Sequence, residues 1–283
     1  MLQSRWIYVI RKSVLHSNQE GQDIKMKARI KFTKAGSMRF IGHLDVMRYF
    51  QKAMRRAEIN VSYSQGFSPH QLMSFTSPLG IGLSSDAEYL DITLEETDTP
   101  QVMADRINAV MNDEIRVKGF TYLKDSAKPS MAALVACDYI IAVKPGKSSP
   151  LEEVAFTKEE ACKFMLQDKI EVLKKTKKSE KLIDIKQGIY NMAGSLKDFE
   201  EMVSGKLIEN VELCLDKECK AVLCCRLASG SVTNIKPGLV LEEFCRFAGV
   251  PYDETVYQVH RLEMYAETGG ELVPMMEYDA VQL

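Results

Sequence analysis

The chain has 283 residues, of which 46% are hydrophobic, and it carries a formal net charge of -2 at pH 7. This composition excludes an intrinsically disordered chain, and the length suffices for two ordinary domains. No apolar run approaches the roughly 20 residues needed to cross a bilayer, so a membrane-spanning segment is excluded as well.

The first 25 residues precede any strand or helix pattern, and we expect them to be an extension outside the fold. Their apolar core, Trp6 to Ile10, is closed by two basic residues and is too short for a secretory signal. Met26 stands directly before a strand pattern, which makes it an alternative start to Met1. Export is therefore not expected.

Residues 26–125 predict a first half of mixed structure. KARIKFT alternates like a strand, and the helix that follows over 43–59 carries an apolar stripe at steps of three or four, formed by Leu44, Met47, Phe50, Met54 and Ala57. The later predicted elements are strands over 72–78 and 87–95, a helix over 99–112 and a strand over 115–123. The order β-α-β-β-α-β is that of a ferredoxin-like unit.

The same order recurs over residues 137–266. The predicted elements are a strand over 137–144, a helix over 157–167 with a capping box of Thr157 and Glu160, a hairpin over 170–186, strands over 208–215 and 219–229, a helix over 237–250 and a strand over 256–266. The predicted fold class is α+β, an α/β sandwich of two tandem ferredoxin-like (βαββαβ) halves. A link near 125–136 joins the halves, and residues 267–283 are expected to be a C-terminal tail.

Seven cysteines occur without a CxxC pair, which is typical of a reduced, cytoplasmic protein. Cys219, Cys224 and Cys225 lie in a predicted buried strand, where cysteine behaves as a small apolar side chain. Their spacing does not suit zinc or an iron–sulfur cluster, so no metal site is predicted.

Charge is distributed unevenly along the chain. Residues 26–85 carry nine Lys or Arg against two acidic residues, a net +7, whereas residues 86–283 sum to -11. On the first predicted helix Arg48, Lys52 and Arg55 follow at steps of four and three, with Arg56 beside them. Such a row can follow a phosphate backbone, and it can equally be a solvated helix face. A lysine-rich hairpin tip over 174–181 is typical of solubility or edge protection, and it would support RNA binding if it lay on the same face as the basic helix.

The loop SYSQGFSPHQLMSF (62–75) is the second candidate for chemistry. His70 lies in it without apolar periodicity, and a loop histidine titrating near neutral pH can act as a general acid or base. His43, at the start of the first helix, is assigned to a cap or core position ahead of catalysis. Tyr63, Gln65 and Phe67 suit base stacking and polar contacts, although aromatic residues also anchor loops onto cores. PLGIGLSS (78–85) does not open a helix, so it is not a dinucleotide-binding loop.

The stretch RFIGHLDVMRYFQKAMRRAEINVSYSQGFSPHQLMSFTSPLGIGLSSDAEYLDI (39–92), followed by LIDIKQGI, NIKPGLVLEEF and VHRLEMY, resembles the radical SAM-linked (radical SAM-associated) family of bacterial proteins with a domain of unknown function. The resemblance implies association with radical SAM chemistry and leaves the activity undefined. The chain has no C-x-x-x-C-x-x-C motif, so an iron–sulfur cluster and S-adenosylmethionine would have to come with a partner radical SAM enzyme.

Three functions are consistent with these patterns. The first is a cytoplasmic accessory protein that recognises RNA or an RNA-linked substrate for a radical SAM enzyme, through Arg48, Lys52, Arg55, Arg56, Tyr63, Gln65, Phe67 and His70. The second is a metal-independent RNA-processing enzyme that uses His70, with His43 as a further candidate, for acid and base catalysis. The third is a protein-interaction scaffold. The sequence does not predict an oligomeric state.

Overall fold

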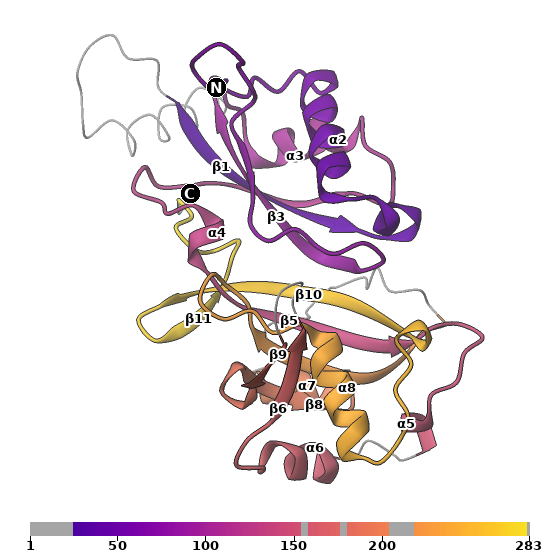
Figure 1. Ribbon diagram of the computed structural model, residues 1–283. Helices are drawn as coiled ribbons and strands as arrows, with labels where there is room; N and C mark the ends of the chain where they lie inside the picture. The colour runs from indigo at the N-terminus through magenta and orange to yellow at the C-terminus, as the bar shows by residue number, and fades with distance from the viewer. Residues whose placement is uncertain (1–24, 154–157, 176–179, 204–217, 282–283) are drawn as a thin grey trace. The chain divides into compact units, whose positions relative to one another are not determined.

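A computed structural model describes residues 25–153, 158–175, 180–203 and 218–281. The chain is a mixed α+β protein with a large, mostly antiparallel sheet, and its residues group into two compact units (Figure 1). Unit 1 contains the described residues up to Ile81, Ala87–Ala133 and those from Ala266 onward, and unit 2 contains Gly82–Asp86 and Leu134–Tyr265.

Unit 1 is built from strands and two main helices. Its elements are β1 (Met26–Lys34), the 3-10 helix η1 (Gly36–Phe40), α2 (His43–Arg56), β2 (Met73–Phe75), β3 (Ser84–Leu94), α3 (Pro100–Asn108), β4 (Val117–Tyr122), α4 (Ser130–Ala133) and β11 (Glu271–Pro274). The first three residues of β3 belong to unit 2. The strand order is β4-β1-β3-β2, and the β1–β4 and β2–β3 pairs are antiparallel.

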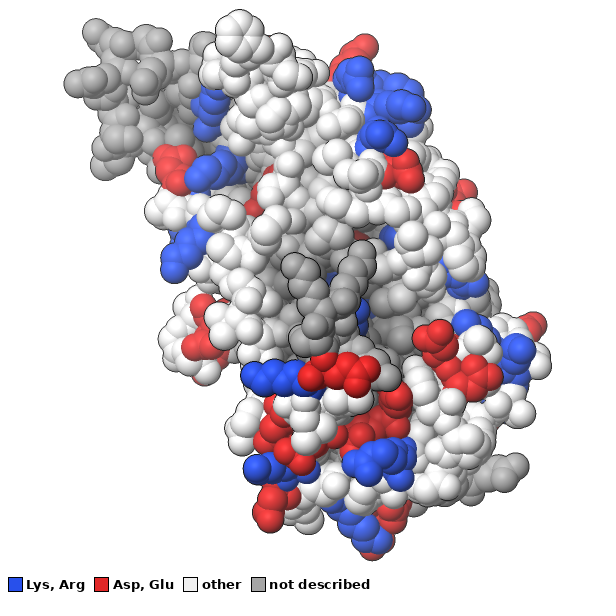
Figure 2. Space-filling view, in the orientation of Figure 1, with Lys and Arg blue, Asp and Glu red and all other residues white. Residues whose placement is uncertain are grey.

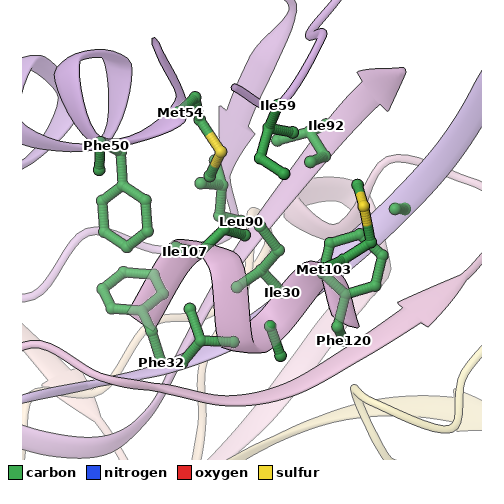
Figure 3. Packing of buried hydrophobic residues seen from close by; sticks show 14 of the residues in the cluster. Ile30, Phe32, Phe50, Met54, Ile59, Leu90, Ile92, Met103, Ile107 and Phe120 are labelled. Carbon is green, nitrogen blue, oxygen red and sulfur yellow. The ribbon is translucent and has the colours of Figure 1, made fainter. Parts of the chain in front are cut away.

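One face of these strands packs against α2 and α3 (Figure 1). Phe50 and Met54 of α2 meet Ile30 and Phe32 of β1, and Ile107 of α3 joins the same core, as Figure 3 shows. Each such buried side chain contributes about 1.5–3 kcal/mol to folding. Because side chains alternate along a strand, the residues between these core positions point to the opposite face of the sheet.

The apolar stripe of α2 is rotated from the predicted one. Val46 and Ala53 are buried together with Phe50 and Met54, whereas Leu44 is 59% exposed. Leu44 lies two residues before Val46 and therefore on the opposite side of the helix, so the prediction for this residue was wrong. The predicted helix itself is confirmed, and Asp45 lies in its first turn. The predicted helix at Pro100 is confirmed too, with Thr99 as its N-cap.

Unit 2 contains the remaining elements. They are β5 (Leu134–Val143), α5 (Pro150–Glu153), α6 (Lys158–Met165), β6 (Glu171–Lys175), β7 (Glu180–Asp184), η2 (Lys186–Gly188), β8 (Ile189–Ala193), α7 (Leu196–Met202), β9 (Lys220–Ala228), α8 (Pro237–Phe247), η3 (Glu254–Val256) and β10 (Tyr257–Thr268). The strand order is β10-β5-β9-β8, and β6 and β7 form a separate hairpin. Ser84 and Ser85, at the start of β3, pair in parallel with His260 and Arg261 of β10.

The core of unit 2 combines aromatic and small apolar side chains. Phe164 of α6 packs edge-on against Phe244 of α8, with ring centroids 5.3 Å apart. On α7, Phe199 is fully buried in a cluster with Ile140 and Cys224. The helix α8 begins at Pro237 and is followed by Gly249 at φ +69, where a glycine is favoured, as predicted for its two ends.

Some predictions concern the two ends of the chain and the segments that lie between the described ranges. The expected extension (residues 1–25, apart from Lys25), the strand over 208–215 and the tip residues Lys177 and Lys178 lie outside the described residues. Residues 267–283, expected to be a tail, contribute β11 and the buried Met275 to unit 1. No helix in the described part of the chain is long and apolar enough to cross a membrane.

Candidate functional site

The stretch from Ser62 to Leu72 forms a narrow β-hairpin, here called the 62–72 hairpin. Tyr63 and Gln71 form an antiparallel bridge, and the backbone N–H of Ser64 donates to the carbonyl of His70 at 2.8 Å. Gly66 turns the chain at φ +111, a conformation that L-side chains rarely adopt. The loop predicted from its glycine and proline is therefore an ordered hairpin with its tip at residues 65–69.

The hairpin base is anchored to β3 and its tip is open to solvent. The N–H of Ser62 donates to the carbonyl of Thr93, and the N–H of Thr93 donates to the carbonyl of Leu72. Phe67 at the tip is fully exposed, and Gln65 beside it is exposed as well. Phe67 therefore does not anchor the loop onto the core, which leaves its ring available for stacking on a ligand.

His70 is held in place by the hairpin itself. Its Nδ1 lies 2.8 Å from the hydroxyl of Ser64, and its backbone N–H donates to the same oxygen at 3.1 Å. These two contacts fix the orientation of the ring. The other ring nitrogen, Nε2, does not bond to Ser64. A histidine oriented by a neighbour in this way can donate to, or accept from, a bound ligand.

A pocket with a volume of about 290 Å³ lies beside His70 in unit 1. It opens on the sheet face opposite to α2 and α3, because its polar strand residues alternate with those of the helix-side core. Its lining residues are Lys27, His70, Leu72, Met73, Ser74, Asp91, Ile92, Thr93, Leu123, Ala127, Lys128 and Pro129.

Asp91 supplies a fixed carboxylate to this pocket. The fully buried Arg29 donates to both of its oxygens, from Nε at 2.7 Å and from Nη2 at 3.2 Å. Arg29 also donates to the carbonyls of Met275 and Tyr278 near the C-terminus. The ion pair of Arg29 and Asp91 is thus neutral overall. The Asp91 side chain is still 16% exposed and can accept a further hydrogen bond.

Two lysines add positive charge to the pocket. Lys27 donates from Nζ to the carbonyl of Asp125 at 3.0 Å and more weakly to that of Ala127 at 3.5 Å. The ammonium group of Lys128 is exposed and makes no such contact among the described residues. With Asp91 neutralised by Arg29, Lys27 and Lys128 leave the pocket with a net positive charge.

The predicted basic row lies on the other side of unit 1, along the exposed face of α2. Arg48 forms an exposed pair with Asp45 at 3.3 Å, and Arg55 donates to its own helix at the carbonyl of Gln51. Arg56 donates to the carbonyl of Val110, and Lys52 has no ion-pair partner in the described residues. Figure 2 shows basic side chains gathered near α2.

The predicted site residues therefore form two separate groups. Arg48, Lys52, Arg55 and Arg56 lie on the helix side of the sheet, where His43 also packs its ring edge-on against Phe75 at 5.2 Å. His70 lines the pocket on the opposite side. No contact joins His43 and His70 among the described residues, so the structure does not assemble them as an acid–base pair.

The uneven charge of the sequence does not make unit 1 basic as a whole. Against the nine basic residues of 26–85, residues 87–133 add nine acidic and five basic side chains, and residues 266–283 add four acidic and no basic ones. The two segments that fold with the basic stretch therefore neutralise it. What survives is local positive charge, on α2 and at the pocket.

Unit 2 contains a polar network that the sequence did not reveal. His260 lies 2.9 Å from Asp86 through Nε2 and 2.9 Å from the hydroxyl of Ser84 through Nδ1. Gln258 donates to the same hydroxyl at 3.0 Å. The order Asp–His–Ser resembles that of a hydrolase triad. However, Ser84 and His260 are both 0% exposed, so a substrate cannot reach them.

A buried ion pair lies elsewhere in unit 2. Arg226 donates to both oxygens of Asp138, at 2.7 and 2.8 Å, and the hydroxyl of Tyr265 donates to Asp138 at 2.7 Å. Burial raises the pKa of Asp138, and the hydrogen bonds and charge of Arg226 oppose that shift. Burial also raises the pKa of Tyr265, which keeps its hydroxyl a donor.

The predicted buried strand is confirmed as β9 for Cys224 and Cys225, whereas Cys219 lies just before the strand and is half-buried. Cys224 and Cys225 are 0% exposed, and burial raises the pKa of the Cys224 thiol to about 12. Both are therefore unreactive thiols, whereas Cys162 is exposed. Across the residues that the structure describes, no group of three or more His, Cys, Asp or Glu is arranged to hold a metal ion.

Comparison with known proteins identifies the family. The profile of a family described as an uncharacterized protein conserved in bacteria (DUF2344) matches residues 27–237, which is most of the chain. The chain therefore belongs to this family, and the match includes α2, the 62–72 hairpin and the pocket residues. No curated protein matches the chain.

Proposed function

We propose that this protein is an accessory protein that binds RNA or an RNA-linked substrate and presents it to a partner enzyme. The observation that carries the proposal is the exposed face of α2, on which Lys52, Arg55 and Arg56 have no carboxylate partner among the described residues. The pair of Arg48 with Asp45 is exposed and contributes little, so this cation is available too. Unpaired cations in a row gain most from binding phosphates.

The tip of the 62–72 hairpin supports the same proposal. A fully exposed Phe67 exposes apolar surface to water without packing on anything in its own unit, and a partly exposed Tyr63 lies nearby in the chain. Stacking on unpaired bases gives such rings a function. Because the tip is held at both ends of the hairpin, little ordering is needed on binding.

The partner we propose is a radical SAM enzyme in the cytoplasm. The support is the resemblance of residues 39–92 to radical SAM-linked bacterial proteins, together with the absence of a C-x-x-x-C-x-x-C motif. In this arrangement the partner supplies the iron–sulfur cluster and S-adenosylmethionine, and this chain supplies substrate recognition.

We also propose that the two units are tandem ferredoxin-like halves. In unit 1 the elements follow the order β1-α2-β2-β3-α3-β4, and the strands lie in the order β4-β1-β3-β2. In unit 2 the strand order β10-β5-β9-β8 repeats those positions, with the β6–β7 hairpin and α7 as additions. The element order of unit 1 is that of the ferredoxin-like unit.

The second candidate function is a metal-independent RNA-processing enzyme. It is favoured by one observation: His70 is oriented by Ser64 at the edge of a pocket that also contains Lys27 and Lys128. A cleavage assay separates it from the first candidate, since His70→Ala would abolish turnover and spare RNA binding on α2. A protein that binds no RNA and cleaves none would instead be a scaffold.

The test of the proposed function is a titration of a fluorescent single-stranded RNA at 50 and 200 mM salt. Each phosphate contact contributes about 0.7 to the slope of log K against log salt, so Lys52→Met combined with Arg55→Met is expected to lower the slope by about 1.4. Lys220→Met, in β9 of unit 2, is the matched control and should leave the slope unchanged.

A second variant tests the hairpin tip in the same titration. Phe67→Ala is expected to cost about 1–3 kcal/mol of binding, the usual value of one stacked base, with an unchanged salt slope. Because Phe67 is fully exposed, its loss should not alter stability. RNA binding that is absent at both salt concentrations, or that neither variant weakens, would contradict the proposal.

A further inference from the structure

We infer that the pocket beside His70 is a binding site for a nucleoside monophosphate group, separate from the RNA-binding face proposed on α2. The pocket and the α2 face lie on opposite sides of the sheet of unit 1, so one does not depend on the other. Its volume of about 290 Å³ lies at the lower limit, about 300 Å³, of small-molecule sites. It therefore suits one compact ligand and not a dinucleotide.

The walls of the pocket suit a flat ring. Leu72, Leu123, Ala127 and Pro129 provide apolar surface. Ligand sites are commonly lined in this way, with a few polar groups that fix the orientation of the ligand. A nucleobase is a planar group of this kind, with donors and acceptors confined to its edge.

The polar groups of the pocket are arranged by depth. The half-buried Ser74 and Thr93 carry hydroxyls that form no hydrogen bond within the described part of the chain. Asp91, also half-buried, is held by Arg29 yet remains able to accept another hydrogen bond. Together they offer an acceptor and two hydroxyls to the amino group of a base or to ribose.

The positive groups lie at the exposed edge. Lys128 and His70 are exposed, and Lys27 has two of its three donors directed to the carbonyls of Asp125 and Ala127. One donor of Lys27, the ammonium group of Lys128 and the free ring nitrogen of His70 are thus available to an anion. A phosphate attached to the base through ribose would reach this edge.

The pocket is built in advance of binding. The N–H of Ser130 donates to Asp91 at 2.9 Å, and the hydroxyl of Thr76 donates to that of Ser130 at 2.7 Å. Asp279 accepts from the N–H of Lys128 through its side chain and from that of Lys124 through its carbonyl. The segment 124–130 that forms one wall is therefore fixed at both ends, which lowers the ordering cost of binding.

Two kinds of ligand contain a nucleoside monophosphate group: a free mononucleotide and the phosphorylated end of an RNA chain. The experiment titrates the full chain with adenosine and uridine 5′-monophosphates, with the two nucleosides, and with a trinucleotide bearing either a 5′-phosphate or a 5′-hydroxyl. Isothermal titration calorimetry measures the affinity. A monophosphate that binds at least tenfold more tightly than its nucleoside supports the site, and the trinucleotides show which source is preferred.

Three variants locate the ligand. Lys128→Met should weaken monophosphate binding about tenfold or more, because it removes a charge-assisted hydrogen bond. Lys124→Met, in the same segment but outside the pocket lining, should change it less than twofold. Thr93→Val keeps the shape of the side chain and should weaken binding several-fold with unchanged thermal stability.

Different results would contradict the proposed nucleotide site and the proposed RNA-binding face. Lys52→Met is expected to leave monophosphate binding unchanged, since Lys52 lies on the helix side of the sheet. Absence of monophosphate binding at millimolar concentration would overturn the inference without affecting the α2 proposal. Equal weakening by Lys128→Met and Lys124→Met would overturn it as well, because binding would then reflect general charge.

Discussion

Two sets of polar groups, one in each unit, differ in whether a ligand can reach them. In unit 2, Asp138 accepts from Arg226 and Tyr265, and its side chain is only 1% exposed, so a ligand cannot reach it. In unit 1, the hydroxyls of Ser74 and Thr93 and the ammonium group of Lys128 border a pocket without such partners among the described residues. Satisfied buried groups hold a structure together, and unsatisfied accessible ones bind ligands.

The largest effect is expected from Arg226→Met. The substitution leaves the buried Asp138 without its cationic partner, and breaking a buried pair in this way costs about 3–5 kcal/mol. Urea denaturation measures the change in the free energy of unfolding. The control, Arg48→Met on the exposed face of α2, should change stability by no more than about 0.5 kcal/mol. A loss below about 1 kcal/mol for Arg226→Met would remove the distinction drawn between the units.

A smaller loss is expected from His260→Leu. The hydroxyl of Ser84 and the carboxylate of Asp86 each lose one buried hydrogen bond, at a cost of about 1–3 kcal/mol. The same variant should bind RNA and monophosphates normally. If it kept its stability and lost a binding activity instead, the Asp86–His260–Ser84 network would belong to the functional site.

The smallest effect is expected at Glu114, which supports the segment before α2. Its carboxylate accepts from the hydroxyl of Ser37 and the N–H of Met38, and these bonds lower its pKa from the usual 4.5. Stability from a lowered pKa is present above pH 4.5 and is lost as the pH falls through the lowered value. Melting temperatures between pH 5 and 3 should therefore fall less for Glu114→Gln than for the native chain; parallel curves would argue against this role.

Local sequence patterns predicted most of the regular elements, because strand alternation and helix periodicity are set by neighbouring residues. The strands β1, β9 and β10 and the helices α3 and α8 lie where the patterns place them. The short elements β8 and α7, within residues 189–202, were missed because five or seven residues give little periodic signal. Leu44 was misplaced because the buried side of α2 carries Val46 and Ala53 beside Phe50, which puts Leu44 on the opposite side of the helix.

The functional site was harder to predict, because its residues are distant in the chain. The sequence indicated His70, yet Lys27 and Asp91 reach the same pocket through the pairing of β1 with β3, and Lys128 reaches it through the contact of its segment with Asp279. His260 and Asp86 are separated by 174 positions and meet because β10 and β3 pair. The net positive charge of residues 26–85 was misleading for the same reason. Acidic segments far along the chain belong to the same unit and neutralise that charge.

The most direct test of the account is hydrogen–deuterium exchange of the full chain with and without single-stranded RNA. Groups that bind the ligand should become protected, and the buried network of unit 2 should not respond. The account predicts slower exchange in peptides that cover α2 and the 62–72 hairpin, with no change in β9 and β10. Protection confined to β9 and β10, with α2 and the hairpin unchanged, would contradict it.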